Sequence, residues 1–201
     1  MAEKSDLIPF PSGGIAVIIG ASGGIGSAVM TQLASSARFD DVIGLGRRSA
    51  PSIDLLSEKS IAAAATVMSG KSAPIRLIID ATGVLSDGRL QPEKGLKQIN
   101  AEQMAQVLAV NTIGPALLLK HFIPLLPEHG KSMFATLSAK VGSIGDNHLG
   151  GWYSYRASKA ALNQLVRTAS IELRRRKPSA ICVALHPGTV DTGLSAPFAR
   201  K

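Results

Sequence analysis

Short apolar runs alternate with longer segments of helical periodicity along the whole chain. The apolar runs predict strands at residues 15–19, 42–45, 77–80, 133–137 and 180–185, with a further short strand near Ile53. Helical periodicity predicts helices at residues 24–37, 61–68, 101–123 and 153–175, the third of them bent at Pro115. This alternation is typical of a parallel sheet covered by helices. We therefore predict an α/β fold of the Rossmann type, a doubly wound parallel sheet with helices on both faces.

Length and composition indicate one globular domain over residues 1–201. The chain is 45% hydrophobic, which is enough to bury a substantial core. Apolar runs such as IAVIIG are far too short to cross a bilayer, and the N-terminus MAEKSDLIPF has no apolar segment of a secretory signal. The only cysteine, Cys182, lies in the apolar run AICVAL, which predicts a buried, unreactive thiol. We expect a cytoplasmic protein that does not bind membranes.

The chain is basic, with 22 Lys and Arg against 14 Asp and Glu and a net charge of +8. The densest basic cluster, LRRRK at residues 173–177, ends a predicted helix, where cations interact favourably with the helix dipole. Aromatic residues make up only 4% of the chain, too few for a surface on which bases stack. Nucleic-acid binding is therefore not predicted, and the positive charge suits an anionic cofactor better.

A glycine-rich turn, IIGASGGIGSAV, joins the first predicted strand to the first helix. Gly20, Gly24 and Gly26 have the spacing G-x-x-x-G-x-G, with Ser22 and Ile25 between them. Glycines at such a junction allow backbone N–H groups to approach a phosphate, and the helix N-terminus favours its negative charge. The turn predicts a dinucleotide site that includes all five residues.

The end of the second predicted strand indicates which dinucleotide binds. Proteins that select NAD place an acidic residue there to bind the ribose 2′-hydroxyl, whereas this chain has Gly46 followed by Arg47 and Arg48. A guanidinium group can bind a 2′-phosphate through paired, charge-assisted hydrogen bonds. We therefore predict NADP(H) as the cofactor, held in part by Arg47 and Arg48.

Chemistry is predicted in GGWYSYRASKAALN, where Tyr155 precedes Lys159 by four residues. On a helix these positions share one face. Facing a cleft, the pair could form a proton donor whose pKa the ammonium lowers, whereas on an open surface it would have no chemistry.

The chain resembles the short-chain dehydrogenase/reductase family. The glycine turn is followed in family order by DATG at 80–83, VNTIG at 110–114, YRASK at 155–159 and HPGTVDT at 186–192. The motifs span nearly the whole chain and are most similar to the carbonyl-reductase-like branch that includes C-factor and Sniffer. The resemblance implies an enzyme that transfers a hydride between NADP(H) and a small-molecule carbonyl or alcohol.

The family resemblance also implies roles for individual residues. Tyr155 is expected to be the general acid/base, and its pKa is expected to be lowered by Lys159 and by the oxidised nicotinamide. Lys159 is also expected to bind the nicotinamide ribose, and Asn111 to hold a water that links Lys159 to solvent. The family has two adjacent serines after the fifth predicted strand, where this chain has serine followed by alanine. Ser138 is our candidate for orienting the substrate, and Ser143 is the alternative.

The same resemblance implies further cofactor contacts. Asp54 and Leu55 are expected near the adenine, and Ala81, Thr82 and Gly83 near the adenosine. The residues expected to border the nicotinamide are Pro187, Gly188, Val190 and Thr192. Asp80 stands where the family has asparagine and is expected to stabilise the sheet. The histidines lack metal-ligand spacing, so no metal site is predicted.

Two functions remain open at this point, an NADP(H)-dependent oxidoreductase and an NADP(H)-binding regulatory or signalling protein with little or no turnover. The chain ends soon after HPGTVDT, so we expect the family's final strand and substrate-binding helix to be missing. The resemblance also implies a homodimer or homotetramer, because the family commonly dimerises through its two long helices, here 101–123 and 153–175. The second of these helices carries more apolar surface than one sheet face requires.

Overall fold

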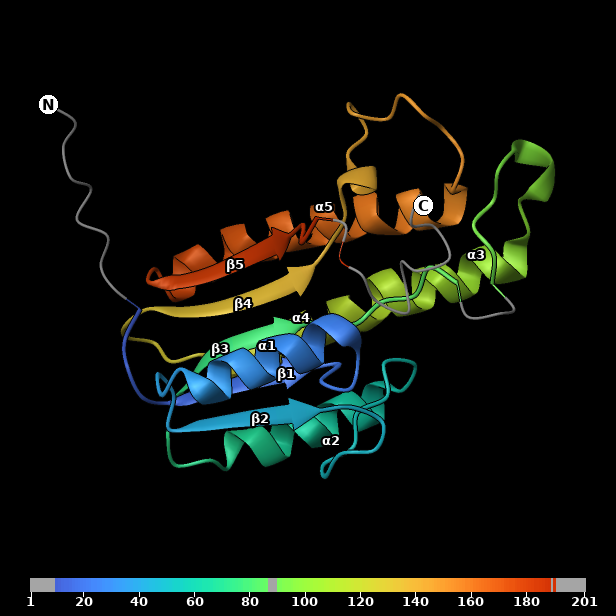
Figure 1. The fold of residues 1–201 in the computed structure, drawn as a ribbon. Coiled ribbons are helices and arrows are strands. Elements are labelled where there is room, and N and C mark those ends of the chain that lie inside the picture. Colours follow the sequence, from blue (N-terminus) through green and yellow to red (C-terminus); the bar gives the residue numbers. More distant parts are fainter. Residues whose placement is uncertain (1–9, 87–89, 189, 191–201) are drawn as a thin grey trace, which may run out of the picture.

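The computed structural model describes residues 10–86, 90–188 and 190. In these residues one sheet has the strand order β2-β1-β3-β4-β5, and every neighbouring pair is parallel (Figure 1). The strands are β1 (Ile15–Ile19), β2 (Asp41–Leu45), β3 (Ile75–Asp80), β4 (Ser132–Leu137) and β5 (Ala180–Leu185). All of β1 is buried, as expected for a central strand of a parallel sheet.

Helices cover both faces of the sheet. They are α1 (Gly24–Ser35), α2 (Glu58–Ser69), α3 (Ala101–Leu108), α4 (Gly114–Phe122) and α5 (Tyr153–Arg176), with short 3₁₀ turns at Leu96–Gln98, Ile123–Leu125 and Lys140–Gly142. Helix α1 lies on one face, whereas α2, α4 and α5 lie side by side on the other (Figure 1). This division follows because right-handed crossovers run from β1 to β2 in one direction and from β2 back to β3 in the other. The predicted doubly wound parallel fold is confirmed.

The main core lies between the sheet and the layer formed by α2, α4 and α5. Phe122 of α4, Phe134 of β4 and Leu162 of α5 are completely buried within it. Cys182 of β5 belongs to the same core, and burial raises the pKa of its thiol to about 11. The thiol is therefore protonated at neutral pH. The predicted burial of Cys182 is confirmed, and its lack of reactivity stays a prediction.

The strand predicted near Ile53 is wrong. Ile53 is buried, yet its segment pairs with no strand and closes back on the end of β2, because Ile53 N donates to Gly46 O over 2.9 Å. Ser49 Oγ closes the same loop: it accepts a hydrogen bond from Gly46 N and can donate to Gly46 O or Pro51 O. The apolar side chain of Ile53 enters the core from a loop. A short apolar run alone does not distinguish such a loop from a buried strand.

The bend predicted at Pro115 lies one turn earlier. Residues Ala109–Ile113 form a π-helical turn between α3 and α4, and Gly114 N donates to Ala109 O, five residues back. Pro115 lies in the first turn of α4, where its missing N–H has little cost. The turn carries Asn111, and π-helical turns of this kind often occur at functional sites.

The run Ala101–Leu125, which includes α3 and α4, is long and apolar enough to cross a membrane by length and composition, with a mean hydropathy of 1.3. It packs within the domain against α5 and α2, and 44% of its most apolar window is buried there. Core helices of globular domains share these properties, so this run is weak evidence for a membrane span.

The strand order reverses between β1 and β3. From β1 the chain continues to β2 on one side, and from β3 it continues to β4 and β5 on the other. In open parallel sheets, ligands bind beyond the carboxyl ends of the strands at this reversal. The loops that follow β1, β3 and β4 are therefore the first place to look for a site.

Candidate active site

A pocket of about 640 Å³ lies at the carboxyl ends of the strands. It is lined by the loops after β1, β3, β4 and β5 and by the start of α5. The lining residues are Gly23, Gly24, Ile25, Ala81, Thr82, Gly83, Leu85, Leu137, Ser138, Ala139, Lys140, Val141, Trp152, Tyr155, Lys159, His186, Pro187, Gly188 and Val190. The pocket thus joins the predicted phosphate-binding turn to the predicted acid/base pair.

The glycine turn leaves no space for a side chain at Gly26 and holds Gly20 in a conformation that favours glycine. Gly20 has a φ of +84°, and a Cβ on Gly26 would lie 2.2 Å from Gly20 O. Gly23 precedes α1 without any side-chain cap, so the N–H groups of Gly24 and Ile25 are left for a ligand. This arrangement fits a phosphate at the helix N-terminus. Ser22 is exposed in the same turn.

At the end of β2, Arg47 and Arg48 are both exposed, and no carboxylate takes the place of Gly46. A Cβ on Gly46 would lie 3.9 Å from Ser22 Oγ, so the serine and the arginine loop are adjacent. These residues lie beyond the pocket lining, at the side of the glycine turn. Their charge and position fit a 2′-phosphate.

Asp54 and Leu55 do not line the pocket. Asp54 Oδ1 accepts a hydrogen bond from Leu56 N over 3.0 Å, and Leu55 packs against α4, where a Cβ on Gly114 would lie 2.9 Å from Leu55 Cβ. Their structural roles are therefore visible, whereas the predicted adenine contact stays a prediction.

Asn111 is completely buried next to the loop after β3. Its side chain accepts from Val84 N and donates to Val84 O, both over 2.8 Å, and Nδ2 also donates to Ser158 Oγ over 3.2 Å. A Cβ on Gly83 would lie 3.4 Å from Asn111 Oδ1 and 3.6 Å from Lys159 Nζ. Asn111 thus ties the post-β3 loop to α5 beside Lys159. The predicted water at Asn111 stays a prediction.

Lys159 lies deep in the pocket wall with only 3% of its surface exposed. Its Nζ donates to Leu137 O at the end of β4 over 2.8 Å and lies 5.9 Å from the centre of the Tyr155 ring. Burial lowers the pKa of Lys159 to about 8, while the negative charge of Asp80 acts in the opposite direction. The predicted pair therefore shares one pocket.

The expectation that Lys159 lowers the pKa of Tyr155 is wrong for the chain alone, whereas the expected effect of the oxidised nicotinamide stays a prediction. Burial raises the pKa of the phenol above its ordinary value of 10.0. The ammonium of Lys159 is directed to Leu137 O, so it does not overcome the loss of solvation around the phenol. At neutral pH Tyr155 is consequently a protonated phenol, which is the form that donates a proton.

Asp80 has a part in the site that the sequence did not reveal. The carboxylate is completely buried at the end of β3 and accepts from Thr136 Oγ1 over 2.6 Å and from Thr82 N over 3.0 Å. Burial raises the pKa of Asp80, and these hydrogen bonds oppose the rise. As predicted, it joins neighbouring elements of the sheet, but its charge also acts on Lys159. The signal was a carboxylate at the end of an apolar strand.

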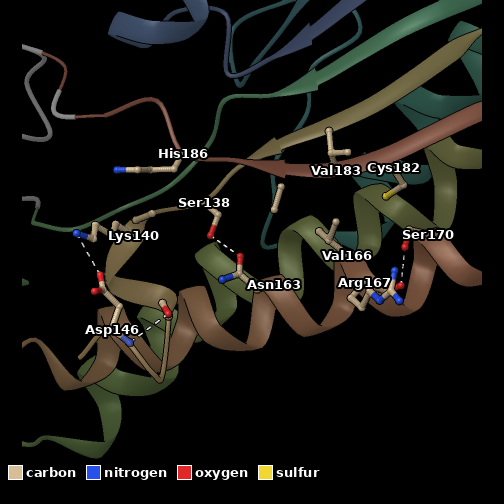
Figure 2. Close-up of a pocket in the computed structure, with 13 residues that line it drawn as sticks. Ser138, Lys140, Asp146, Asn163, Val166, Arg167, Ser170, Cys182, Val183 and His186 are labelled. Carbon is tan, nitrogen blue, oxygen red and sulfur yellow. Dashed lines mark hydrogen bonds and ion pairs between the residues drawn. The ribbon is translucent and has the colours of Figure 1, made fainter. Parts of the chain in front are cut away.

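Ser138 is held by α5 rather than left free in the pocket. Figure 2 shows its hydroxyl directed at Asn163, to whose Oδ1 it donates over 2.6 Å. Ser138 lines both the main pocket and an open second pocket of about 680 Å³ between α5 and β5. Ser143 lines only the second pocket and accepts from Asp146 N. Of the two serine candidates, Ser138 alone reaches the main pocket, where Ala139 stands beside it.

Beyond β5, Pro187, Gly188 and Val190 line the pocket, in the place that the sequence predicts for a nicotinamide border. Thr192 lies outside the described residues. The predicted absence of a final strand also falls outside them.

The family follows from a comparison with known sequences. A model of the family described as short chain dehydrogenase matches residues 45–201, the greater part of the sequence. The chain belongs to the short-chain dehydrogenase family. It is therefore an oxidoreductase, and the resemblance drawn from its motifs is confirmed.

Individual members of the short-chain dehydrogenase family match much of the chain. The 1-hydroxy-2-glutathionyl-2-methyl-3-butene dehydrogenase of Rhodococcus sp. (strain AD45) is 31% identical over 191 residues, which cover 90% of this chain and 80% of the relative. C-signal of Myxococcus xanthus is 36% identical over 104 residues, covering 52% of this chain and 61% of the relative. The NADPH-bound carbonyl reductase from chicken fatty liver is 27% identical, with a TM-score of 0.77 over 93% of this chain and 82% of that one.

The sequence did not predict three apolar members of the pocket lining. They are Leu85, Val141 and Trp152. Trp152 has a φ of +53°, and its ring meets the Tyr155 ring edge-on at 6.2 Å. A left-handed tryptophan before a helix has no distinctive sequence pattern, so only the structure could identify it.

The electrostatic link between Asp80 and Lys159 predicts a pH effect. In Asp80→Asn, the opposing negative charge is lost, so the pKa of Lys159 should fall below about 8. As the pH rises, the Lys159 ammonium should then lose its proton at a lower pH than in the parent, and any binding that depends on its charge should weaken there. We expect the basic limb of the pH profile for NADPH binding to move toward acid, measured by titration between neutral and alkaline pH.

Glu172→Gln is the matched control for this experiment, because it removes one carboxylate charge from the exposed surface of α5. Its profile should coincide with that of the parent. An unchanged basic limb in Asp80→Asn would show that Asp80 does not act on Lys159.

Proposed function

We propose that this protein is an NADP(H)-dependent reductase that converts a small-molecule aldehyde or ketone into an alcohol. The observation that carries the proposal is the common pocket of the glycine turn and the Tyr155–Lys159 pair. One end has helix N–H groups for phosphates, and the other has a buried proton donor and an ammonium. The NADPH-bound carbonyl reductase from chicken, which has the same fold, supports the cofactor assignment.

The cofactor would be held at several separate points. The N–H groups of Gly24 and Ile25 would bind the phosphates, and Arg47 and Arg48 would bind the 2′-phosphate next to Ser22. Lys159 would bind the nicotinamide ribose at the other end. The bound cofactor supplies the hydride that joins the carbonyl carbon.

Tyr155 donates the proton in the proposed reaction. The substrate's carbonyl oxygen takes the proton from Tyr155 Oη while its carbon gains the hydride, so the product is the alcohol and Tyr155 is left as a phenolate. The nearby ammonium of Lys159 stabilises that phenolate until a proton returns from solvent. At neutral pH the phenol is protonated, which is the form that reduction requires.

Ser138 orients the carbonyl in this proposal. Its single O–H is donated to Asn163, so the carbonyl oxygen can take that hydrogen bond only if the hydroxyl rotates away from Asn163. The apolar side chains of Leu85, Val141 and Trp152 would surround the rest of the substrate.

The arginine pair predicts cofactor preference. The parent should bind NADPH more tightly than NADH, and Arg47→Ala with Arg48→Ala should weaken NADPH binding by at least roughly 10-fold, because each charge-assisted hydrogen bond that is lost contributes about 1.5–3 kcal/mol. NADH binding should change little, as measured by fluorescence titration.

A double variant at Arg174 and Arg175 is the control, since it removes the same charge from the exposed end of α5. It should leave both affinities unchanged. Equal affinity of the parent for NADPH and NADH would contradict the argument from Gly46 and the arginines.

The acid role of Tyr155 is tested by Tyr155→Phe. The ring stays and only the hydroxyl is lost, so folding and NADPH affinity should survive while carbonyl reduction falls by about 10²- to 10⁴-fold. A substrate is first found by following NADPH consumption over aldehydes, ketones and quinones.

Tyr153→Phe makes the same change in the first turn of α5, at a residue that does not line the pocket. Its rate should equal that of the parent. If Tyr155→Phe reduces the substrate as fast as Tyr153→Phe, the general-acid assignment fails.

A further inference from the structure

The carboxylate of Glu93 is buried, although Glu93 does not line the pocket. The residue lies between β3 and α3, and only 2% of its surface is exposed. Its Oε2 accepts from Ser154 N over 3.1 Å, and its Oε1 accepts from the Ser154 hydroxyl and, over 3.4 Å, from Gln103 Nε2. Carboxylates are rarely buried so completely unless hydrogen bonds hold them.

The start of α5 has no cap of its own. Trp152 occupies the N-cap position in a left-handed conformation and its side chain makes no capping hydrogen bond. The N–H groups of a helix's first turn need partners from elsewhere, and a negative charge there interacts favourably with the helix dipole. Glu93 supplies both from a distant part of the sequence. Burial raises the pKa of Glu93, but the hydrogen bonds from Ser154, the Glu93 backbone and Gln103 together lower it by more, so the carboxylate is ionised at neutral pH.

Glu93 contacts two residues that shortly precede Tyr155 in the chain. The carboxylate binds Ser154, the residue directly before Tyr155, and the backbone oxygen of Glu93 accepts from Trp152 N. The Trp152 ring in turn meets the Tyr155 ring edge-on at 6.2 Å. Glu93 therefore contacts both the residue directly before Tyr155 and the residue whose ring lies against the Tyr155 ring.

We propose that Glu93 is a positioning residue, which caps α5 from outside and thereby aims the Tyr155 hydroxyl into the pocket. The proposal rests on the general-acid role of Tyr155 for its effect on turnover. Displacing a reacting group by about 1 Å can lower a rate by roughly 10²-fold. Loosening the first turn of α5 should thus reduce turnover although Glu93 does not touch the substrate.

Glu93→Gln tests the proposal, because it keeps the size of the side chain and removes the charge and one acceptor. We expect the kcat for carbonyl reduction to fall by roughly 10- to 100-fold, with NADPH affinity within about 2-fold of the parent. Rates are compared at a temperature where each variant is fully folded. If this variant does not fold, Ser154→Ala removes a donor from the same contact and should shift kcat in the same direction by less.

Ser57→Ala is the matched control. Ser57 caps α2 by accepting from Ser60 N over 3.3 Å, so its loss also removes a helix cap, but from a helix without a proposed reacting group. Its kcat should equal that of the parent even where its melting temperature falls. A decrease in kcat no larger for Glu93→Gln than for Ser57→Ala would overturn the proposal.

Trp152 provides a second measurement that needs no turnover, because it is the only tryptophan of the chain. Glu93→Gln should change its fluorescence maximum or its quenching by NADPH, whereas Ser57→Ala should leave both unchanged. If the parent binds NADPH but reduces no carbonyl, the proposed function fails while this emission still tests the cap. Unchanged Trp152 emission in Glu93→Gln would overturn the positioning role itself.

Discussion

The burial of one lysine ammonium group constrains several elements of this structure. Lys159 Nζ is held by Leu137 O at the end of β4, and the charge of Asp80 offsets part of the cost of burial. The turn Lys140–Gly142 lies so close that a Cβ on Gly142 would come within 2.9 Å of Lys159 Cβ. Asn111 from the π-helical turn and Gly83 from the loop after β3 complete the surroundings. The contacts of Lys159 therefore fix the positions of the ends of β3 and β4 relative to the middle of α5.

The parallel sheet makes that assembly possible. Its strand order places the ends of β1, β3 and β4 next to one another, so a glycine turn, a buried carboxylate and a lysine-binding carbonyl meet at one edge. Helix α5 crosses this edge and brings the phenol and the ammonium on one face. Each side chain is ordinary by itself, and the chemistry arises from their common position. The family assignment agrees with this arrangement.

Local patterns in the sequence were enough for most of the fold and for the centre of the site. Apolar runs predicted all strands of the described sheet, and helical spacing predicted that Tyr155 and Lys159 share a face. The strand predicted near Ile53 was wrong because a loop with a buried apolar side chain has the same sequence pattern as a short strand. Glu93 was missed because its cap joins residues 61 positions apart, and no local pattern records such a contact. The raised pKa of Tyr155 depends on surrounding burial, which the sequence does not state.

The most direct test of the whole account follows a label instead of a rate. NADPH deuterated at the transferred position of its nicotinamide is incubated with the protein and with a carbonyl substrate, and the alcohol is examined by mass spectrometry. The account predicts that the product gains deuterium on the former carbonyl carbon, with the proton on oxygen coming from solvent. A protein that binds NADPH tightly, yet transfers no deuterium to any aldehyde, ketone or quinone tested, would contradict it.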